Sequence, residues 1–228
     1  LCDRRQRQMC IRDRSDAQIY ERTCDAKTYP FSDPSPVATP NNSYYPYFRF
    51  DGFSMQAQEK QWKMVVLEND YVKLTVTPEI GGKIWGAIDK VNNKEFVYTN
   101  GVVKFRDVAM RGPWTSGGIE FNFGIIGHAP TCSTPIDYLT KKNVDGSVSC
   151  HIFSYEWITR TVWNVEINLP KDKAYFTTHT TWFNQSSIDQ PYYQWMNAGY
   201  ATKTGTRFYY PGTYSIGPVS YTHLRAHE

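Results

Sequence analysis

The sequence lacks several features that would assign a class at once. No apolar run approaches the roughly 20 residues that span a bilayer, so we expect no membrane insertion. The five cysteines show no paired spacing, which argues against a disulfide framework and against a zinc site. His151 and His179 fall in separate expected strands without a carboxylate at ligand spacing, so we expect neither a metal nor another cofactor.

Both ends of the chain read as translated DNA rather than natural protein. The early run RRQRQMCIRDR and the final run VSYTHLRAHE each match, in codon order, an adapter used to make sequencing libraries. We therefore expect residues 1–14 and 219–228 to be artefacts and exclude them from fold reasoning. An arginine-rich terminus is otherwise typical of an arm that binds nucleic acid. Codon order explains these residues better.

The two expected artefacts account for the net charge of +3. The first segment carries five arginines against two aspartates, a net of +3, and the last carries one arginine against one glutamate, a net of zero. The rest of the chain is formally neutral, so nothing argues for nucleic acid or an anionic membrane as a partner. We expect the natural start to be missing, and we favour a periplasmic or extracellular location over a cytoplasmic one.

The composition favours strands over helices. Aromatic residues make up 16% of the chain, leucine is scarce, and threonine, valine, isoleucine and tyrosine are plentiful. Residues 15–47 hold several prolines and predict an extended lead segment, with the strands beginning after it. Residues 48–218 predict an incomplete, all-β antiparallel sandwich whose missing partner is the C-terminal part of the same chain.

Alternation and turn residues place the expected strands. Val72, Leu74 and Val76 alternate with polar residues, as in a half-buried strand. Turn pairs such as Asn92-Asn93 and Asp145-Gly146 separate the apolar runs. The expected strands cover residues 64–68, 72–77, 83–89, 95–98, 119–123, 147–157, 160–169, 174–184 and 192–202.

The segment 104–135 is the richest in side chains that could carry chemistry. It holds five candidate residues among glycines and prolines, namely Arg111, Trp114, Glu120, Asn122 and His128. A pyranose has an apolar C–H face that stacks on aromatic rings and a rim of hydroxyls that needs polar partners. Arginine, glutamate and asparagine supply those hydrogen bonds, and charged partners strengthen them. This mixture predicts carbohydrate as the partner.

Three strings carry a resemblance to a known family. VVLENDYVKLTVTPEIGGKIWGAIDKVNNKEFVY, MRGPWTSGGIEFNFGIIGHAP and QPYYQWMNAGYA resemble a bacterial domain family of unknown function that is often joined to tetratricopeptide repeats. That family is similar in fold to galactose mutarotase, a large β-supersandwich shared with domains of several glycoside hydrolases. The resemblance extends from about Tyr29 to Pro218, and it implies a carbohydrate-active or carbohydrate-binding domain.

The resemblance also implies roles for single residues. Arg111 stands where mutarotase-like enzymes hold the substrate with an arginine, and His128 where they place a catalytic histidine. The late glutamate base of such enzymes would lie beyond Pro218. The local motifs differ from those of true epimerases, so the reaction type stays open between a glycoside hydrolase and an epimerase.

Glu120 and Asn122 have two interpretations. In IEFNF, Ile119, Phe121 and Phe123 alternate with them, so both polar side chains lie on one face, about 7 Å apart. They are either a general acid with a hydroxyl ligand, or an ordinary solvated pair on the outer face.

The remaining candidates have structural alternatives too. His128 could transfer protons near neutral pH or simply bond the backbone, and Arg111 could clamp a hydroxyl pair or anchor its loop. Trp114, Tyr193 and Trp195 could stack on a sugar or fill the core.

The working hypothesis assigns Glu120 and His128 to catalysis. Arg111, Trp114, Asn122, Tyr193 and Trp195 are assigned to substrate binding. The alternatives are a non-catalytic glycan-binding domain and a structural platform preceding helical repeats.

Overall fold

The chain forms strands joined by turns and loops. The computed structural model describes residues 15–31, 34–35, 46–47, 49–50, 52–107, 113–124, 128–191, 193–207, 209 and 212. Over these residues it contains no helix, so the expected all-β class is confirmed. Accordingly, no helix in this part of the chain is long and apolar enough to cross a membrane. The strands are β1 (Gln18–Tyr29), β2 (Pro34–Ser35), β3 (Arg49–Phe50), β4 (Gln58–Glu68), β5 (Val72–Thr77), β6 (Lys83–Asp89), β7 (Lys94–Val97), β8 (Val103–Lys104), β9 (Arg106–Asp107), β10 (Pro113–Trp114), β11 (Ile119–Phe123), β12 (Asp137–Lys142), β13 (Val148–Glu156), β14 (Thr161–Leu169), β15 (Thr177–Asn184) and β16 (Gln194–Ala198).

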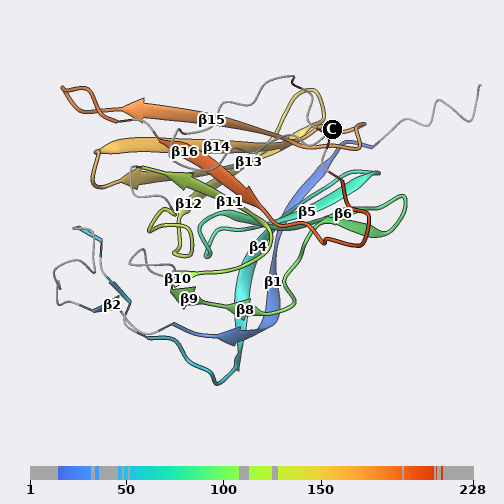
Figure 1. Cartoon of the computed structure of the whole chain (residues 1–228). Helices are drawn as coiled ribbons and strands as arrows, with labels where there is room; N and C mark the ends of the chain where they lie inside the picture. The colour runs from blue at the N-terminus through green and yellow to red at the C-terminus, as the bar shows by residue number, and fades with distance from the viewer. Residues whose placement is uncertain are drawn as a thin grey trace, which may run out of the picture.

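Two sheets pack face to face. The larger sheet has eight strands in the order β16-β11-β6-β5-β4-β1-β8, with β7 paired to β6, and the smaller has the order β12-β13-β14-β15. Figure 1 shows the smaller sheet lying across the larger one as a separate layer. Nearly all pairings are antiparallel, and β1 with β8 is a short parallel exception. The expected sandwich is therefore present over the described residues.

Hairpins build the whole of the smaller sheet and four strands of the larger one, as the turn residues predict. Strands β4, β5, β6 and β7 pair in chain order, and so do β12, β13, β14 and β15. Asn93 and Gly146 both adopt positive φ at the turns predicted from their dipeptides.

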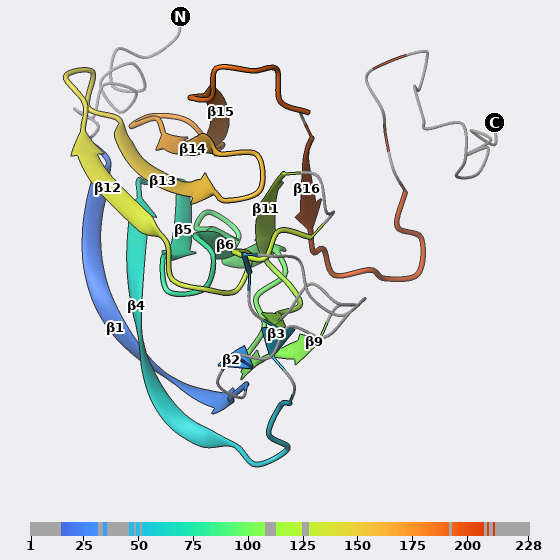
Figure 2. The ribbon, with the colours of Figure 1, turned by 90° about the vertical axis from the view of Figure 1, so that its left-hand side faces the viewer.

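β1 corrects the expectation that strands begin only after the proline-rich lead. It pairs with β4 along eleven residues, from Gln18 with Glu68 to Thr28 with Gln58. Figure 2 shows the two strands side by side as one long curved pair. The strand was missed because its sequence, QIYERTCDAKTY, has little apolar alternation. It ends directly before Pro30, the first proline of the lead, since proline cannot donate to a ladder.

The main core lies between the two sheets. The larger sheet contributes residues such as Leu67, Leu74 and Phe121, and the smaller contributes Ile152, Trp163 and Val165, all buried. Phe123 stacks on Trp163 with the ring centroids 4.4 Å apart, which joins β11 to β14 across the interface.

The opposite face of the larger sheet is covered as well. A second buried cluster comprises Trp62, Met64, Ile80, Trp85, Val103 and Phe105. Because both faces are covered, β4 carries a continuous buried run from Met64 to Leu67 instead of an alternating one. The candidate site belongs to this second face.

Candidate functional site

Two glycines place the strand that carries Glu120 and Asn122. Gly117 and Gly118 both adopt positive φ immediately before β11. At Gly118 a Cβ would collide with the backbone carbonyl of Ile84 on β6. The close approach requires glycine, and it fixes the register in which Ile119 lies opposite Ile84.

Strand pairing gathers the polar side chains on one face. Glu120 lies opposite Asn197 of β16, and Asn122 lies opposite Trp195. Paired residues point to the same side of a sheet, so all four share a face. Lys83 is next to Ile84 in β6 and therefore points to that face too.

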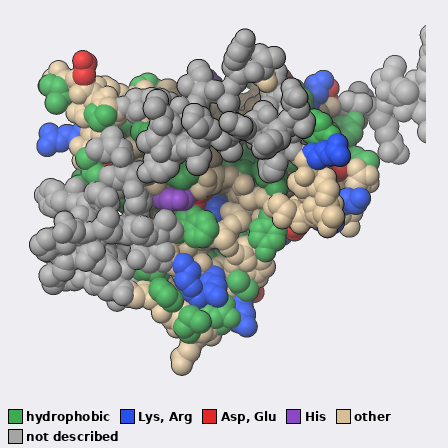
Figure 3. Space-filling model, in the orientation of Figure 1, with side chains coloured by type: hydrophobic (Ala, Val, Ile, Leu, Met, Phe, Trp, Pro, Cys, Tyr) green, Lys and Arg blue, Asp and Glu red, His purple; other side chains and the backbone are tan. Residues whose placement is uncertain are grey.

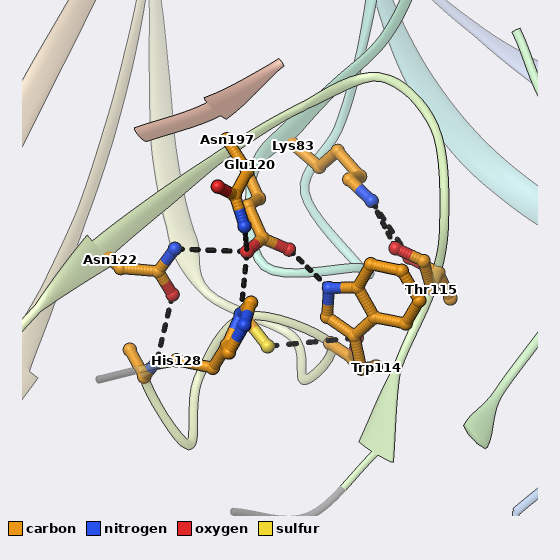
Figure 4. A network of polar contacts seen from close by, with 10 residues as sticks. Lys83, Trp114, Thr115, Glu120, Asn122, His128 and Asn197 are labelled. Carbon is orange, nitrogen blue, oxygen red and sulfur yellow. Dashed lines mark hydrogen bonds and ion pairs between the residues drawn. The ribbon is translucent and has the colours of Figure 1, made fainter. Parts of the chain in front are cut away.

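A single buried carboxylate organises the cluster. Glu120 is 2% exposed, so it is not the solvated outer residue of the second interpretation. Its Oε1 accepts hydrogen bonds from Asn122 Nδ2 (3.0 Å) and Asn197 Nδ2 (2.9 Å) and contacts His128 Nδ1 at 2.7 Å. Its Oε2 accepts one from Trp114 Nε1 at 2.6 Å. Figure 4 shows these groups converging on Glu120 from four directions.

The donors fit an ionised Glu120. The indole and amide groups can only donate to it, and Asn122 has its amide orientation fixed because its Oδ1 accepts from the backbone N–H of Ala129 at 2.8 Å. With a carboxylate as acceptor, His128 carries its proton on Nδ1, so in the neutral ring Nε2 is an acceptor. The His128 side chain is 23% exposed, and that exposure gives it access to a ligand.

Two tryptophans flank the histidine ring. Trp195 meets it edge-on with the centroids 4.7 Å apart, and Trp114 does so at 6.2 Å. The indole N–H of Trp195 is buried and has no hydrogen-bond partner among the described residues. An unsatisfied buried donor is rare, and here it lies beside the cluster.

Lys83 is a buried cation beside the same cluster. Its Nζ donates to Thr115 O at 2.5 Å and to Thr115 Oγ1 at 3.1 Å. Burial lowers the pKa of Lys83 to about 8, while the charge of Glu120 opposes that shift. Cys132 lies nearby, and burial, together with Glu120, raises the pKa of its thiol to about 12.

The structure brings together most of the residues predicted from the sequence. Glu120, Asn122, His128, Trp114 and Trp195 form one cluster. The side chain of Tyr193 is 46% exposed and makes none of the cluster's contacts among the described residues. Arg111 lies outside the described residues.

Three participants were not predicted. They are Asn197, Lys83 and Thr115. The signal for Lys83 was weak: a lysine directly after Gly81-Gly82 resembles an ordinary polar residue at a strand end. Lys83 is buried together with the four residues that follow it, Ile84, Trp85, Gly86 and Ala87. Only the structure shows this burial.

The same face of the molecule carries two hollows. One, of about 440 Å³, is lined by residues of β1, β4, β5 and β6 that include Met64, Trp85 and Arg22. The other, of about 260 Å³, is bordered by Trp62 and by residues 133–135, which follow the His128 loop. Glu120 and His128 line neither of them. Figure 3 shows a face hollowed near its centre, where histidine, acidic and basic side chains gather beside hydrophobic ones.

A cross-strand row on the smaller sheet contains His151 and His179. Glu166 lies opposite both His151 and His179, and His151 Nε2 is 3.8 Å from Glu166 Oε1. Strand pairing thus supplies a neighbouring carboxylate that the sequence spacing did not reveal. Among the described residues, no group of three or more histidine, cysteine, aspartate or glutamate side chains is placed to hold a metal ion, and the expectation of no metal stays a prediction.

A similar solved structure is that of a TPR-domain containing protein from Parabacteroides distasonis ATCC 8503. The two share 26% sequence identity with a TM-score of 0.74. The similarity covers 81% of this chain and 32% of the other, so this chain spans about a third of that protein's length.

A family model also matches most of the chain. The matched residues are 39–224, and the model describes a domain of unknown function, DUF5107. The match begins inside the expected lead and ends inside the segment interpreted as adapter, so the expected domain boundaries stay predictions. The expected resemblance to a domain family of unknown function is confirmed. Because the match covers well over half of the sequence, the chain belongs to the DUF5107 family.

Proposed function

We propose that the Glu120–His128 cluster binds carbohydrate through the exposed part of His128 and the aromatic rings around it. The main support for this proposal is the 2.7 Å contact between His128 Nδ1 and the carboxylate of Glu120, which is almost fully buried. This contact orients the imidazole and fixes its tautomer, so that Nε2 is the atom available to a ligand. A group held in this way can accept or donate a proton at a sugar hydroxyl or ring oxygen.

The contacts support a division of labour among the candidates. Glu120 has hydrogen bonds at both oxygens, so its role is to orient His128 and stabilise its protonated form. Asn122 is fully buried and engaged at both ends of its amide, which makes it a positioning residue. Trp114, Trp195 and Tyr193 offer apolar surface for the C–H face of a pyranose, and Arg111 remains a proposed hydroxyl ligand.

A mutarotase-like fold is part of the proposal. The curved eight-stranded sheet, with a polar cluster on the face opposite the smaller sheet, fits a saccharide site on that face. In a longer protein this domain would precede helical repeats, an arrangement suggested by the TPR-domain protein that it resembles.

One observation favours binding without turnover as the second candidate. Acid–base chemistry at an anomeric carbon needs two groups at a productive separation. In the described part of the cluster, His128 alone has a titratable atom that is not already hydrogen-bonded to the protein. A glycan-binding domain needs only the histidine and the aromatic surface.

The test is ligand-induced stabilisation of the full chain by a panel of methyl pyranosides. Binding at one hundred times Kd contributes about 2.7 kcal/mol, so the melting temperature should rise by several degrees. His128→Gln should weaken binding about tenfold or more, because it removes the oriented imidazole that donates or accepts a hydrogen bond at the ligand.

His151→Gln is the matched control, since His151 also lies beside a glutamate but on the smaller sheet. It should bind like the wild type. The proposal fails if no pyranoside stabilises the chain, or if the His128 variant binds as tightly as the control. Faster interconversion of sugar anomers, measured by NMR, would separate an epimerase from a binding domain.

A further inference from the structure

Lys83 is a buried positive charge that the proposed site does not yet use. It is 1% exposed and is held by both oxygens of Thr115. Its Nζ lies 5.8 Å from the ring centroid of Trp114 and 6.0 Å from that of Trp85. Such a cation is costly to bury unless a compensating charge is close.

Glu120 is the matching negative charge. Its neighbours Asn122, Asn197 and Trp114 donate hydrogen bonds but carry no charge, so they do not neutralise it. Lys83 and Glu120 are linked by Trp114, whose Nε1 donates to Glu120 while its ring lies within cation–π range of the ammonium. Figure 4 shows the Lys83 ammonium turned toward Thr115, with the Trp114 ring beside it.

Within the described residues, few other titratable groups act on Lys83. The titratable groups that act on Lys83 are Glu120 from β11 and Cys132 from the loop after His128. The thiol of Cys132 is neutral at physiological pH, because burial raises its pKa to about 12. Over the part of the cluster that the structure describes, the electrostatic balance therefore rests on Lys83, Glu120 and His128.

We infer that Lys83 is a positioning residue that supplies the counter-charge of the Glu120–His128 pair and thereby sets how readily His128 gains a proton. The inference rests on the proposed role of His128 as the group that faces the ligand. A positive Lys83 partly neutralises Glu120 and disfavours a second positive charge on the imidazole. Removing the lysine leaves the carboxylate uncompensated, so it should attract a proton to His128 more strongly.

The test follows the imidazole signals of His128 by NMR as pH is varied, with no ligand present. Lys83→Met should raise the titration midpoint of His128 by about one pH unit. Lys83→Arg keeps the charge and should restore a midpoint near that of the wild type. Lys73→Met removes a half-buried lysine of the same sheet that pairs with Glu68, and it should leave the midpoint unchanged.

A wild-type measurement covers the case in which Lys83→Met does not fold. The His128 signals should then show a second inflection at the pH where the Lys83 side-chain carbon signals titrate. A folded Lys83→Met variant with an unchanged His128 midpoint, or wild-type signals that titrate independently, would overturn the inference. Because no ligand is present in these titrations, the expected change in the His128 midpoint can appear even if no pyranoside binds. It can also be absent even if a pyranoside does bind.

Discussion

At the scale of single residues, the site depends on buried polar groups that need hydrogen-bond partners from other segments. Glu120 sits on a face of β11 where Asn122 is also buried, and four donors or charges from four other segments surround it, namely Lys83, Trp114, His128 and Asn197. The ordering of His128 follows from that arrangement, because a carboxylate held by three neutral donors cannot easily turn away from the imidazole. Substitutions near Glu120 should therefore act through the position of His128.

Two buried thiols give a residue-scale prediction for alkaline pH. Burial raises the pKa of Cys132 and of Cys150 from 9.0 to about 12. A group whose folded pKa is raised contributes stability that is complete below its unfolded pKa and is lost as pH rises toward the folded value. The free energy of unfolding should fall between about pH 9 and 12, by about 1.4 kcal/mol per pH unit for each thiol.

The measurement is urea unfolding at a series of pH values, read as a difference between variants. Cys150→Ala should remove one thiol's share of the alkaline slope, although it also lowers stability at every pH by leaving a small gap in the core. Cys24→Ala is the control, because Cys24 is a half-buried free cysteine of β1 that lies outside the main core. Parallel curves for Cys150→Ala and the wild type would refute the assignment.

At the scale of elements, β11 is positioned by the turn before it. Gly117 and Gly118 bring the chain into β11 against β6, and β16 then pairs along the whole of β11. This geometry sets Glu120 opposite Asn197 and on the same face as Lys83. A change in the turn should therefore reach the site even though the glycines carry no chemistry.

Gly118→Ala should destabilise the protein by about 3 kcal/mol or more. The added Cβ meets the Ile84 carbonyl, and the positive φ of this position strains any other residue. Gly101→Ala is the matched control, because a Cβ there has open space and no positive φ. Urea unfolding compares the two variants; equal stabilities would show that the turn does not constrain β11.

At the scale of the whole molecule, the two sheets are joined by aromatic contacts through the core. Trp163 on β14 stacks on Phe123 at the end of the site-bearing strand, and Trp182 on β15 adds a second ring 5.5 Å away. The face that carries Glu120 is thus supported from behind by the smaller sheet. Stability of the sandwich and geometry of the site should be coupled.

Trp163→Ala should cost about 3–5 kcal/mol, as expected when a large core aromatic is removed. Trp157→Ala is the matched control, since Trp157 is 58% exposed and contacts Tyr155 at the surface. Thermal unfolding and near-ultraviolet circular dichroism would measure both variants. Similar losses from the two substitutions would contradict the placement of Trp163 at the centre of the interface.

Local patterns by themselves predicted most of the longer strands and most of the candidate site. Alternation identified β5 and β11, turn dipeptides located the hairpins, and the motif containing Trp114, Glu120 and His128 named the main cluster. These features depend on residues close together in the chain. The same approach missed β1 and β12, because strands that are mostly exposed carry little apolar alternation.

The tertiary structure decided what long-range packing controls. Period-2 alternation put Glu120 and Asn122 on one face but could not say whether water or protein covers that face, because burial depends on what packs there from elsewhere. Lys83 and Asn197 join the cluster only through the pairing of β6, β11 and β16. A carboxylate that could have been an exposed acid is instead the buried anchor of a histidine, because segments far apart in sequence donate to it.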